Sequence, residues 1–252
     1  MLKKLLRSSR PPAPAPFAAA DGVRIYAVGD IHGCRAELDR LLDMIDADDA
    51  ARPEAETMLV FLGDLVDRGP DSAGVVERLL ALSTTRPGVR FLKGNHEELF
   101  LQALEGTKDA LRLFCRVGGK ETILSYGMSA SEYDALDYAD VARRLDELVP
   151  PAHRAFIAGF EDMIVSGDYA FVHAGIRPDV PLEEQRGSDL RWIRESFLEH
   201  KRPHPKMIVH GHTITPQVDH RPNRIGIDTG AYASGRLTAL GIEGRETWLL
   251  NT

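Results

Sequence analysis

The stretch TMLVFLGDLVDRG at residues 57–69 decides the fold of this chain. Its first part, residues 57–62, is an apolar run with the composition of a buried strand. Its second part is a polar loop with a glycine at each end and two aspartates. Where helices connect the strands of a sheet, sites form in such loops at the carboxyl ends of strands. The stretch therefore predicts one unit of an α/β sheet with chemistry at its end.

The same order of strand, polar loop and helix recurs on both sides of that stretch. Before it, a strand is expected at residues 23–28 and a helix at 35–45. After it, a helix is expected at 72–82, and a third strand at 89–92 precedes a helix near 97–104. Three repeats of this order are typical of an α/β protein.

The second half of the chain is predicted to return to strands after a helical insertion. Residues 111–160 carry weak helical patterns and few strand signals, so we interpret them as an insertion or cap. Residues 163–165 and 169–172 are expected to form a hairpin. Further strands are expected at 207–209, 224–228, 237–242 and 246–250.

Composition limits the class of protein. The 252 residues carry a formal net charge of −7, with 43% hydrophobic and 27% charged residues, which excludes a fibrous or wholly disordered chain. The acidic balance argues against a general nucleic-acid binder. No apolar run reaches the roughly 20 residues that span a bilayer. Cys34 and Cys115, the two cysteines, exclude a disulfide framework and favour a reducing compartment, so we expect a cytoplasmic protein.

The N-terminal segment differs from the rest of the chain. Residues 1–22 combine basic residues with proline and alanine and lack the apolar core of a secretory signal. We expect a flexible tail there, followed by a single domain at residues 23–252. Contact of the basic residues 1–10 with an anionic membrane surface or a partner is the alternative.

Five polar clusters each follow an apolar strand candidate, and each combines glycine with aspartate, asparagine or histidine. Such oxygen and nitrogen donors suit divalent first-row metals. Glycine beside them permits tight turns and leaves room for an ion. The clusters are DIHG at 30–33, GDLVDRG at 63–69, GNHE at 94–97, VHAG at 172–175 and VHGH at 209–212.

Each of these residues taken alone has an ordinary structural explanation. Asp30 and Asn95 fit helix caps. Asp64 and Asp67 fit turns, and His173 fits a buried core histidine. The same accidental chemistry at five strand ends is a poorer explanation than one shared site. The set therefore predicts a metal site.

The motifs GDIHG, GDLVDRG, GNHE, VHAG and VHGHT together resemble the calcineurin-like metallophosphoesterase superfamily over roughly residues 24–250. GDLVDRG followed by GNHE is similar to the PPP-type serine/threonine protein phosphatases, including small bacterial and phage members. The resemblance implies an α/β (α+β) fold in which two mixed β-sheets form a central sandwich flanked by helices. It also implies an open cleft at one edge of the sandwich.

The resemblance implies two divalent metal ions as cofactors. Mn²⁺ is the usual activating ion, and Fe or Zn can occupy the same nitrogen and oxygen ligands. In the family, a hydroxide or water between the two ions is the nucleophile. The implied ligands are Asp30 and His32 for the first ion, Asp64 for both ions, and Asn95, His173 and His212 for the second.

The resemblance also implies the residues that handle the phosphate. Arg68 is the expected phosphate clamp, because a guanidinium fork matches two phosphoryl oxygens; a surface ion pair is the alternative. His96 is the expected general acid for the leaving group, and Asp67 is the carboxylate that orients it. Asn95 and His96 are both expected to contact the substrate.

Several positions keep two interpretations. A second phosphate-binding arginine is usual in the family; Arg194 is favoured over Arg191, although both fit a solvated helix face. Glu97 either supports the site or begins a helix. His210 could lie behind the metal ligands, and Asp228 could be structural. Residues 118–122 either line the substrate groove or form helix caps.

The function implied by the resemblance is hydrolysis of phosphoserine and phosphothreonine in proteins, with phosphotyrosine also accepted by small bacterial members. The alternative is symmetrical bis(5'-nucleosyl)-tetraphosphate hydrolysis, a sister branch with the same metals. That branch typically has a small residue at the position of Asp67 and Asp at that of Glu97, which favours the phosphatase. The expected partner is a phosphoprotein or phosphopeptide, not nucleic acid. A non-enzymatic binding role is disfavoured because every expected ligand is present.

Overall fold

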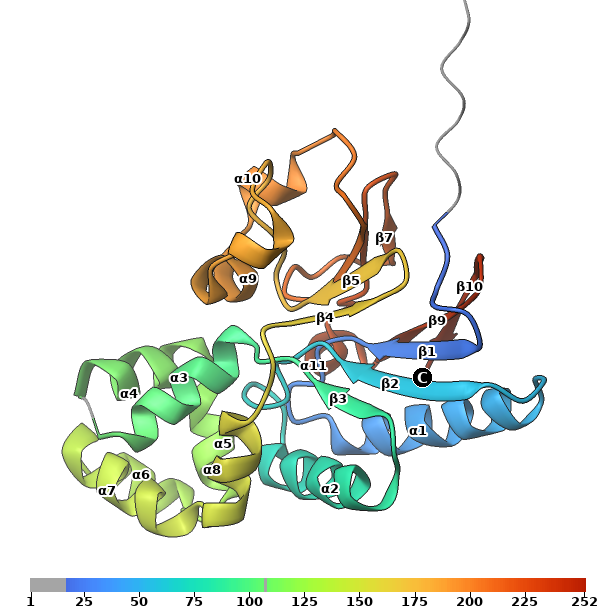
Figure 1. Cartoon of the computed structure of the whole chain (residues 1–252). Coiled ribbons are helices and arrows are strands. Elements are labelled where there is room, and N and C mark those ends of the chain that lie inside the picture. The colour runs from blue at the N-terminus through green and yellow to red at the C-terminus, as the bar shows by residue number, and fades with distance from the viewer. Residues whose placement is uncertain (1–16, 107) are drawn as a thin grey trace, which may run out of the picture.

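Two mixed sheets of five strands each pack face to face in the computed structural model, which describes residues 17–106 and 108–252 (Figure 1). The strand orders are β10-β9-β1-β2-β3 and β4-β5-β6-β8-β7. This arrangement confirms the expected α/β fold. The strands are β1 (Val23–Val28), β2 (Glu56–Phe61), β3 (Val89–Phe91), β4 (Met163–Ser166), β5 (Tyr169–Val172), β6 (Met207–His210), β7 (Asp219–His220), β8 (Arg224–Gly226), β9 (Thr238–Glu243) and β10 (Glu246–Asn251).

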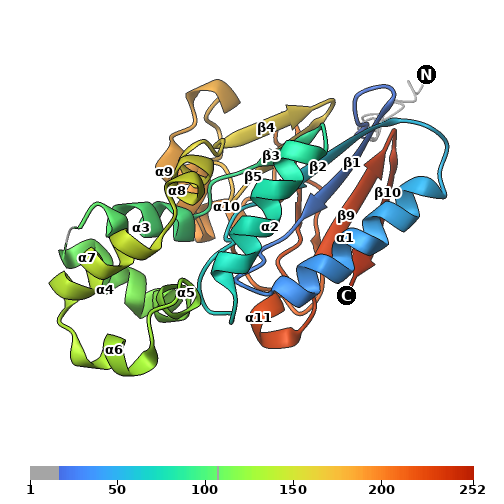
Figure 2. The same cartoon turned by 90° about the horizontal axis from the view of Figure 1, so that it is seen from below.

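Helices cover the outer faces of the sandwich, and further helices form a lobe that packs beside it. Among the described residues, α1 and α2 lie along the first sheet, and α4 to α8 form the lobe beside it (Figure 2). The helices are α1 (Arg35–Ala50), α2 (Ser72–Thr85), α3 (Asn95–Leu104), α4 (Lys108–Phe114), η1 (Cys115–Gly119), α5 (Lys120–Ser125), α6 (Ala130–Ala135), α7 (Tyr138–Leu148), α8 (Pro151–Ala158), η2 (Leu182–Glu184), α9 (Gly187–Trp192), α10 (Glu195–Leu198) and α11 (Ala231–Ser234).

Strand alternation divides the core into layers. Tyr26 and Val28 of β1 pack with the helices outside the first sheet, while Ile25 and Ala27 face the second sheet. Because successive side chains of a strand point to opposite faces, both faces of the sheet are buried. This double burial explains why residues 57–62 form a continuous apolar run.

The parallel strands direct the polar loops to one place. β1, β2 and β3 run parallel in the first sheet, and β5, β6 and β8 run parallel in the second. The carboxyl ends of these strands lead into the loops that carry the polar clusters. Clusters far apart in the sequence therefore meet at one edge of the sandwich.

The insertion is helical, as expected. Its apolar side chains belong to the same hydrophobic core as α1, α2 and the outer face of the first sheet. Phe100 of α3 stacks on Phe114 and Tyr126 of the lobe, with ring centroids 5.5 and 5.7 Å apart. Aromatic contacts of this kind fasten the lobe to α3. That residues 23–252 form a single domain stays a prediction. Within residues 17–106 and 108–252, no helix is both long and apolar enough to cross a membrane.

The last residues of the predicted N-terminal tail contact the sheets. Its residues 1–16 lie outside the described part of the chain. Ala19 N–H donates to the carbonyl of Gly244 (2.7 Å), and Asp168 N–H donates to the carbonyl of Ala18 (2.8 Å). Phe17 contacts the ring of Tyr169, with centroids 6.4 Å apart. Residues 17–20 are thus held between the β4–β5 and β9–β10 turns, and the expected division of the chain at residue 22 stays a prediction.

Candidate metal centre and phosphate site

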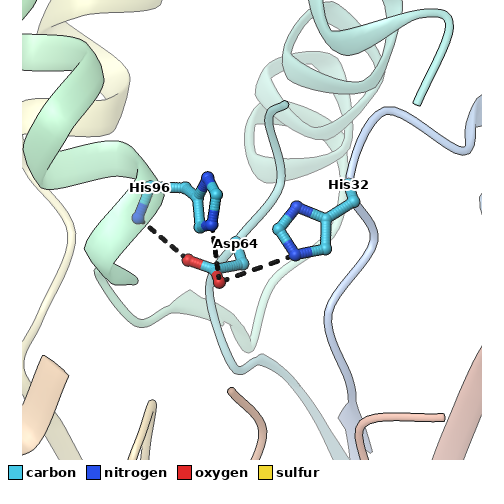
Figure 3. Close-up of side chains that lie close together, drawn as sticks. All are labelled: His32, Asp64 and His96. Atoms are coloured by element: carbon cyan, nitrogen blue, oxygen red, sulfur yellow. Dashed lines mark hydrogen bonds and ion pairs between the residues drawn. The ribbon is translucent and has the colours of Figure 1, made fainter. Parts of the chain in front are cut away.

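The six predicted metal ligands are buried together at the edge where the parallel strands end. Two groups of side chains have donor atoms within 4.8 Å of one another. His32, Asp64 and His96 form the first, and Figure 3 shows the two imidazoles approaching the Asp64 carboxylate from different sides. Asp64, His173 and His212 form the second. Asp64 belongs to both groups, as a carboxylate between two ions would.

Two of the histidines are oriented by backbone carbonyls. His32 Nδ1 lies 2.8 Å from the carbonyl of Val66, and His173 Nδ1 lies 2.8 Å from that of Leu62. A carbonyl accepts only, so each Nδ1 carries a proton and each Nε2 faces the centre. Such a bond fixes the ring tautomer of metal-binding histidines.

Acceptor atoms converge on one point beside His173. Its Nε2 lies 3.0 Å from Asn95 Oδ1, 3.2 Å from His212 Nδ1 and 3.4 Å from Asp64 Oδ1. Burial lowers the pKa of His173, but the Asp64 carboxylate outweighs it and the net shift is upward. A positive charge is therefore favoured where these atoms meet, whether it is a proton or a cation.

Negative charge is concentrated in the site. Asp30, Asp64 and Asp228 are each at most 2% exposed. Burial, and then the charges of Asp228 and Asp64, raise the pKa of Asp30 well above its ordinary value. Within the described part of the chain, Asp30 Oδ1, Asp228 Oδ2 and His212 Nε2 have no hydrogen-bond partner. Since buried unpaired carboxylates are costly, this donor set fits divalent cations, which Asp30, His32, Asp64, Asn95, His173 and His212 would hold.

The backbone around the site is strained. Of the six non-glycine residues with positive φ among those described, five belong to the site and the sixth is Asp179. Such conformations cost of order 1–3 kcal/mol each and persist only where surrounding contacts enforce them. The five are His32 (46°), Asp64 (50°), Asp67 (75°), Arg68 (68°) and His212 (63°).

Two glycines leave room for the carboxylates. A Cβ on Gly94 would lie 2.2 Å from Asp64 Oδ1, and one on Gly211 would lie 2.0 Å from Asp30 Oδ1. Any side chain there would overlap a predicted metal ligand. These motif glycines are therefore required for space.

Glu97 holds the loop that carries Asp64. Its Oε2 accepts the N–H groups of Asp64 (2.8 Å) and Gly94 (2.9 Å), and its Oε1 accepts that of Leu65 (2.8 Å). Burial and the neighbouring Asp64 raise the pKa of Glu97 to about 7. Glu97 also lies in the first turn of α3, so both of its predicted interpretations apply.

Arg68 extends its guanidinium between the two imidazoles of the first group. Its two terminal nitrogens lie 2.9 Å from His32 Nε2 and 2.9 Å from His96 Nε2. The ring of Tyr232, on α11, lies 5.1 Å from the guanidinium carbon and 5.4 Å from the His32 ring. Tyr232 is 39% exposed and lies at the solvent-facing side of the site.

His96 and Asp67 form a buried pair. His96 Nδ1 lies 2.6 Å from Asp67 Oδ2, and both side chains are at most 1% exposed. Burial lowers the pKa of His96, but the carboxylates of Asp64 and Asp67 outweigh it and raise the pKa overall. The pair has the contact expected of an imidazole held by a carboxylate, with its Nε2 directed into the site.

Comparison with known proteins identifies the family. The chain matches the description "Calcineurin-like phosphoesterase" over residues 23–236. It belongs to that family.

Curated relatives of this phosphoesterase are named as tetraphosphatases. A symmetrical bis(5'-nucleosyl)-tetraphosphatase of Acidovorax sp. strain JS42 is 33% identical over 160 residues, covering 64% of this chain and 47% of that enzyme. The chain thus spans about half the length of that relative. The asymmetrical enzyme PrpE of Anoxybacillus flavithermus is 27% identical over 241 residues, covering 87% of this chain and 91% of PrpE.

Solved structures agree on the fold of this phosphoesterase. A candidate diadenosine tetraphosphatase superposes with a TM-score of 0.63 at 23% identity, covering 93% of this chain and 98% of that one. A cold-active protein tyrosine phosphatase of a Shewanella species gives a TM-score of 0.52 at 16% identity, covering 92% and 83%. At such identities the likeness shows the shared fold alone.

The structure separates the two candidate arginines of the phosphoesterase. Arg191 Nε donates to Glu98 Oε2 at 2.9 Å, and Arg191 also pairs with Asp162. Arg194 is exposed, and it makes one long contact of 3.4 Å with the hydroxyl of Thr213, the residue after His212. Among the described residues, Arg194 thus has no carboxylate partner, whereas Arg191 is held by carboxylates.

The remaining predicted positions surround the centre. His210 is fully buried, with Nδ1 3.0 Å from the carbonyl of Gly211 and a pKa that burial lowers to about 4. Asp228 Oδ1 accepts the N–H of Gly230 at 2.9 Å. Tyr232 was not named as a site residue from the sequence. Its position in a short segment between Gly230 and Gly235, soon after a strand, could have indicated it.

Proposed function

We propose that this phosphoesterase is a metal-dependent phosphohydrolase whose leading substrate class is the bis(5'-nucleosyl) tetraphosphates. The match to PrpE carries this choice, because it extends over nearly the full length of both chains. The symmetrical enzymes support the same substrate class over a shorter segment. This choice departs from the phosphoprotein activity expected first and follows its alternative.

The side chains of the site would have different roles in hydrolysis. Arg68 would bind phosphoryl oxygens, because anionic phosphoryl oxygens are stronger acceptors than the imidazole nitrogens that Arg68 contacts here. Arg194, beside Thr213, would add a second guanidinium. When bound, divalent ions would activate water and neutralise phosphoryl charge. As the bond from phosphorus to the leaving oxygen breaks, His96 would give that oxygen its Nε2 proton. Asp67 would stabilise the positive charge of the ring beforehand.

One observation favours phosphoproteins as a second candidate. The buried Asp67 carboxylate contacts His96 Nδ1. Against the effect of burial, Asp64 and Asp67 together raise the pKa of His96, so the ring would keep a proton for the leaving oxygen. A serine or threonine alkoxide is a poor leaving group and needs such a donor, whereas a nucleotide phosphate leaves readily near neutral pH. The pair is therefore of greater use against phosphate esters than against tetraphosphates.

Side-by-side hydrolysis would distinguish the two. The substrates are diadenosine tetraphosphate, a phosphoserine/phosphothreonine peptide and a phosphotyrosine peptide, each with Mn²⁺ and with a chelator. Two ADP molecules would indicate symmetrical cleavage, and AMP with ATP would indicate asymmetrical cleavage. Preference for the peptides would establish the second candidate instead. Hydrolysis that survives the chelator would contradict metal dependence.

A further inference from the structure

A side chain of the helical insertion contacts the carboxylate that orients His96. The Thr122 hydroxyl, on α5, lies 2.6 Å from Asp67 Oδ1, while the other carboxylate oxygen contacts His96. Asp67 N–H also reaches the Thr122 oxygen at 2.8 Å and the Ser72 oxygen at 3.0 Å. The side chains of Thr122, Asp67 and Ser72 are fully buried. Asp67 is thus held at both its carboxylate and its backbone.

Counting protons assigns the direction of these bonds. The hydroxyls of Thr122 and Ser72 lie 2.9 Å apart, and each has one proton. A carboxylate is the stronger acceptor and lies closer, so the Thr122 proton goes to Asp67 Oδ1. Thr122 then accepts from Asp67 N–H and from Ser72 O–H. Every donor and acceptor site of the Thr122 hydroxyl is used.

The segment before Thr122 also contacts the residue next to Asp67. Arg68 N–H donates to the carbonyl of Gly118 at 3.0 Å, and Arg68 Nε reaches the carbonyl of Val117 at 3.4 Å. Gly118 lies in the π-helical turn η1 with φ at 117°, and a Cβ there would lie 2.7 Å from Arg68 Cγ. The insertion therefore supports two consecutive residues with positive φ, Asp67 and Arg68.

We propose that Thr122 is a positioning residue for the proton donor of this enzyme. Its hydroxyl fixes the rotation of the Asp67 carboxylate, so that the other oxygen keeps His96 directed at the leaving oxygen. This role rests on the proposed phosphohydrolase function but not on the choice between tetraphosphates and phosphoproteins. It assigns the insertion a part in catalysis in addition to its packing on α3.

The test compares two small substrates that differ in leaving group, p-nitrophenyl phosphate and phenyl phosphate, with Mn²⁺. A proton donor matters more for the poorer leaving group, so Thr122→Val should lower kcat for phenyl phosphate by roughly 10–100-fold. For p-nitrophenyl phosphate the loss should stay within about threefold. Thr122→Ser keeps the hydroxyl and should restore both rates.

A matched control removes a similar bond far from the site. The Thr57 hydroxyl donates to Asp49 Oδ1 at 2.8 Å, near the start of β2. Thr57→Val should leave the ratio of the two rates unchanged. Bound Mn²⁺ and the unfolding midpoint are measured for every variant, and Thr122→Ala replaces Thr122→Val if the latter does not fold.

The outcomes are distinct. Equal losses of kcat on both substrates, or no recovery in Thr122→Ser, would overturn the role of Thr122 and leave the enzyme a phosphohydrolase. A wild-type chain that hydrolyses neither aryl phosphate nor diadenosine tetraphosphate with Mn²⁺ would overturn the proposed function and the role of Thr122 together. A loss confined to phenyl phosphate, with Mn²⁺ content intact, would establish the positioning role.

Discussion

Replacing Gly94 by alanine should empty the metal centre without altering any ligand. The backbone of Gly94 has φ −83° and ψ 173°, which alanine adopts without strain. The added Cβ, however, would lie 2.2 Å from Asp64 Oδ1, 2.5 Å from Asp64 N and 2.7 Å from Glu97 Oε2. Real Cβ atoms do not approach other atoms so closely, and one of these neighbours is backbone. The loop carrying Asp64 must therefore move away from α3.

The size of the effect follows from these distances. Asp64 Oδ1 must retreat by about 1 Å, the difference between 2.2 Å and the 3.4 Å at which ordinary contact begins. Overpacking of this kind costs about 1–3 kcal/mol. Weakening the bond from Gly94 N–H to Glu97 adds a further 1 kcal/mol or so. We expect Gly94→Ala to lower the free energy of unfolding by about 2–4 kcal/mol, which leaves most domains of this size folded.

Metal content and unfolding together give the assay. The unfolding midpoint of Gly94→Ala should fall by roughly 5–15 °C, and bound Mn²⁺ should fall below that of the wild type. Gly159→Ala is the control, because its φ is −78° and its nearest atoms would lie 3.5 Å from the new Cβ. A Gly94→Ala protein with wild-type Mn²⁺ content and activity would refute the claim that a side chain at residue 94 displaces Asp64.

Three further predictions concern the proton donor, the clamp and pH. His96→Asn should slow hydrolysis of alkyl phosphates about 10²–10⁴-fold and that of p-nitrophenyl phosphate less; equal losses would contradict an acid role. Arg68→Ala should weaken inhibition by phosphate and vanadate by roughly tenfold or more, and unchanged inhibition would exclude a clamp. Burial and the neighbouring His200 lower the pKa of His204 to about 4 from 6.5. The folded state therefore binds fewer protons than the unfolded chain between these values, so its stability is intact above pH 6.5 and declines toward pH 4. His204→Phe should lessen the loss of urea-unfolding stability between pH 7 and pH 5, to which the buried His210 also contributes. A decline of unaltered size would assign it to other groups.

Local sequence was sufficient for the sheets and for the convergence of the polar clusters. Residues 58–62 are apolar because both faces of β2 are buried toward its carboxyl end, and the polar loop begins at Gly63, where the strand has just ended. Parallel pairing then carries the other clusters to the same edge. The meeting of these side chains was predictable because each follows its strand closely, and their role as metal ligands stays a prediction.

Contacts made across large separations were not predictable. Thr122 meets Asp67 across 55 positions, and only the packing of the lobe brings them together. Positive φ at His32 and Asp64 has only a weak signal in residue type, since Asp and His are enriched among non-glycine residues with positive φ but rarely adopt it. β7 is two residues long, too short for alternation to reveal. Residues 17–20 are mostly alanine, and their pairing depends on turns formed more than 140 positions later.

The division of the ligands between the two sheets has a consequence for how the molecule is assembled. His32 and Asp64 follow strands of the first sheet, while His173 and His212 follow strands of the second. A chain in which only one of the two sheets has formed presents an incomplete set of donors. Tight binding of metal ions would then require both sheets to be packed together, so bound metal would mark a fully folded molecule. Truncated or misassembled copies would neither acquire activity nor sequester metal.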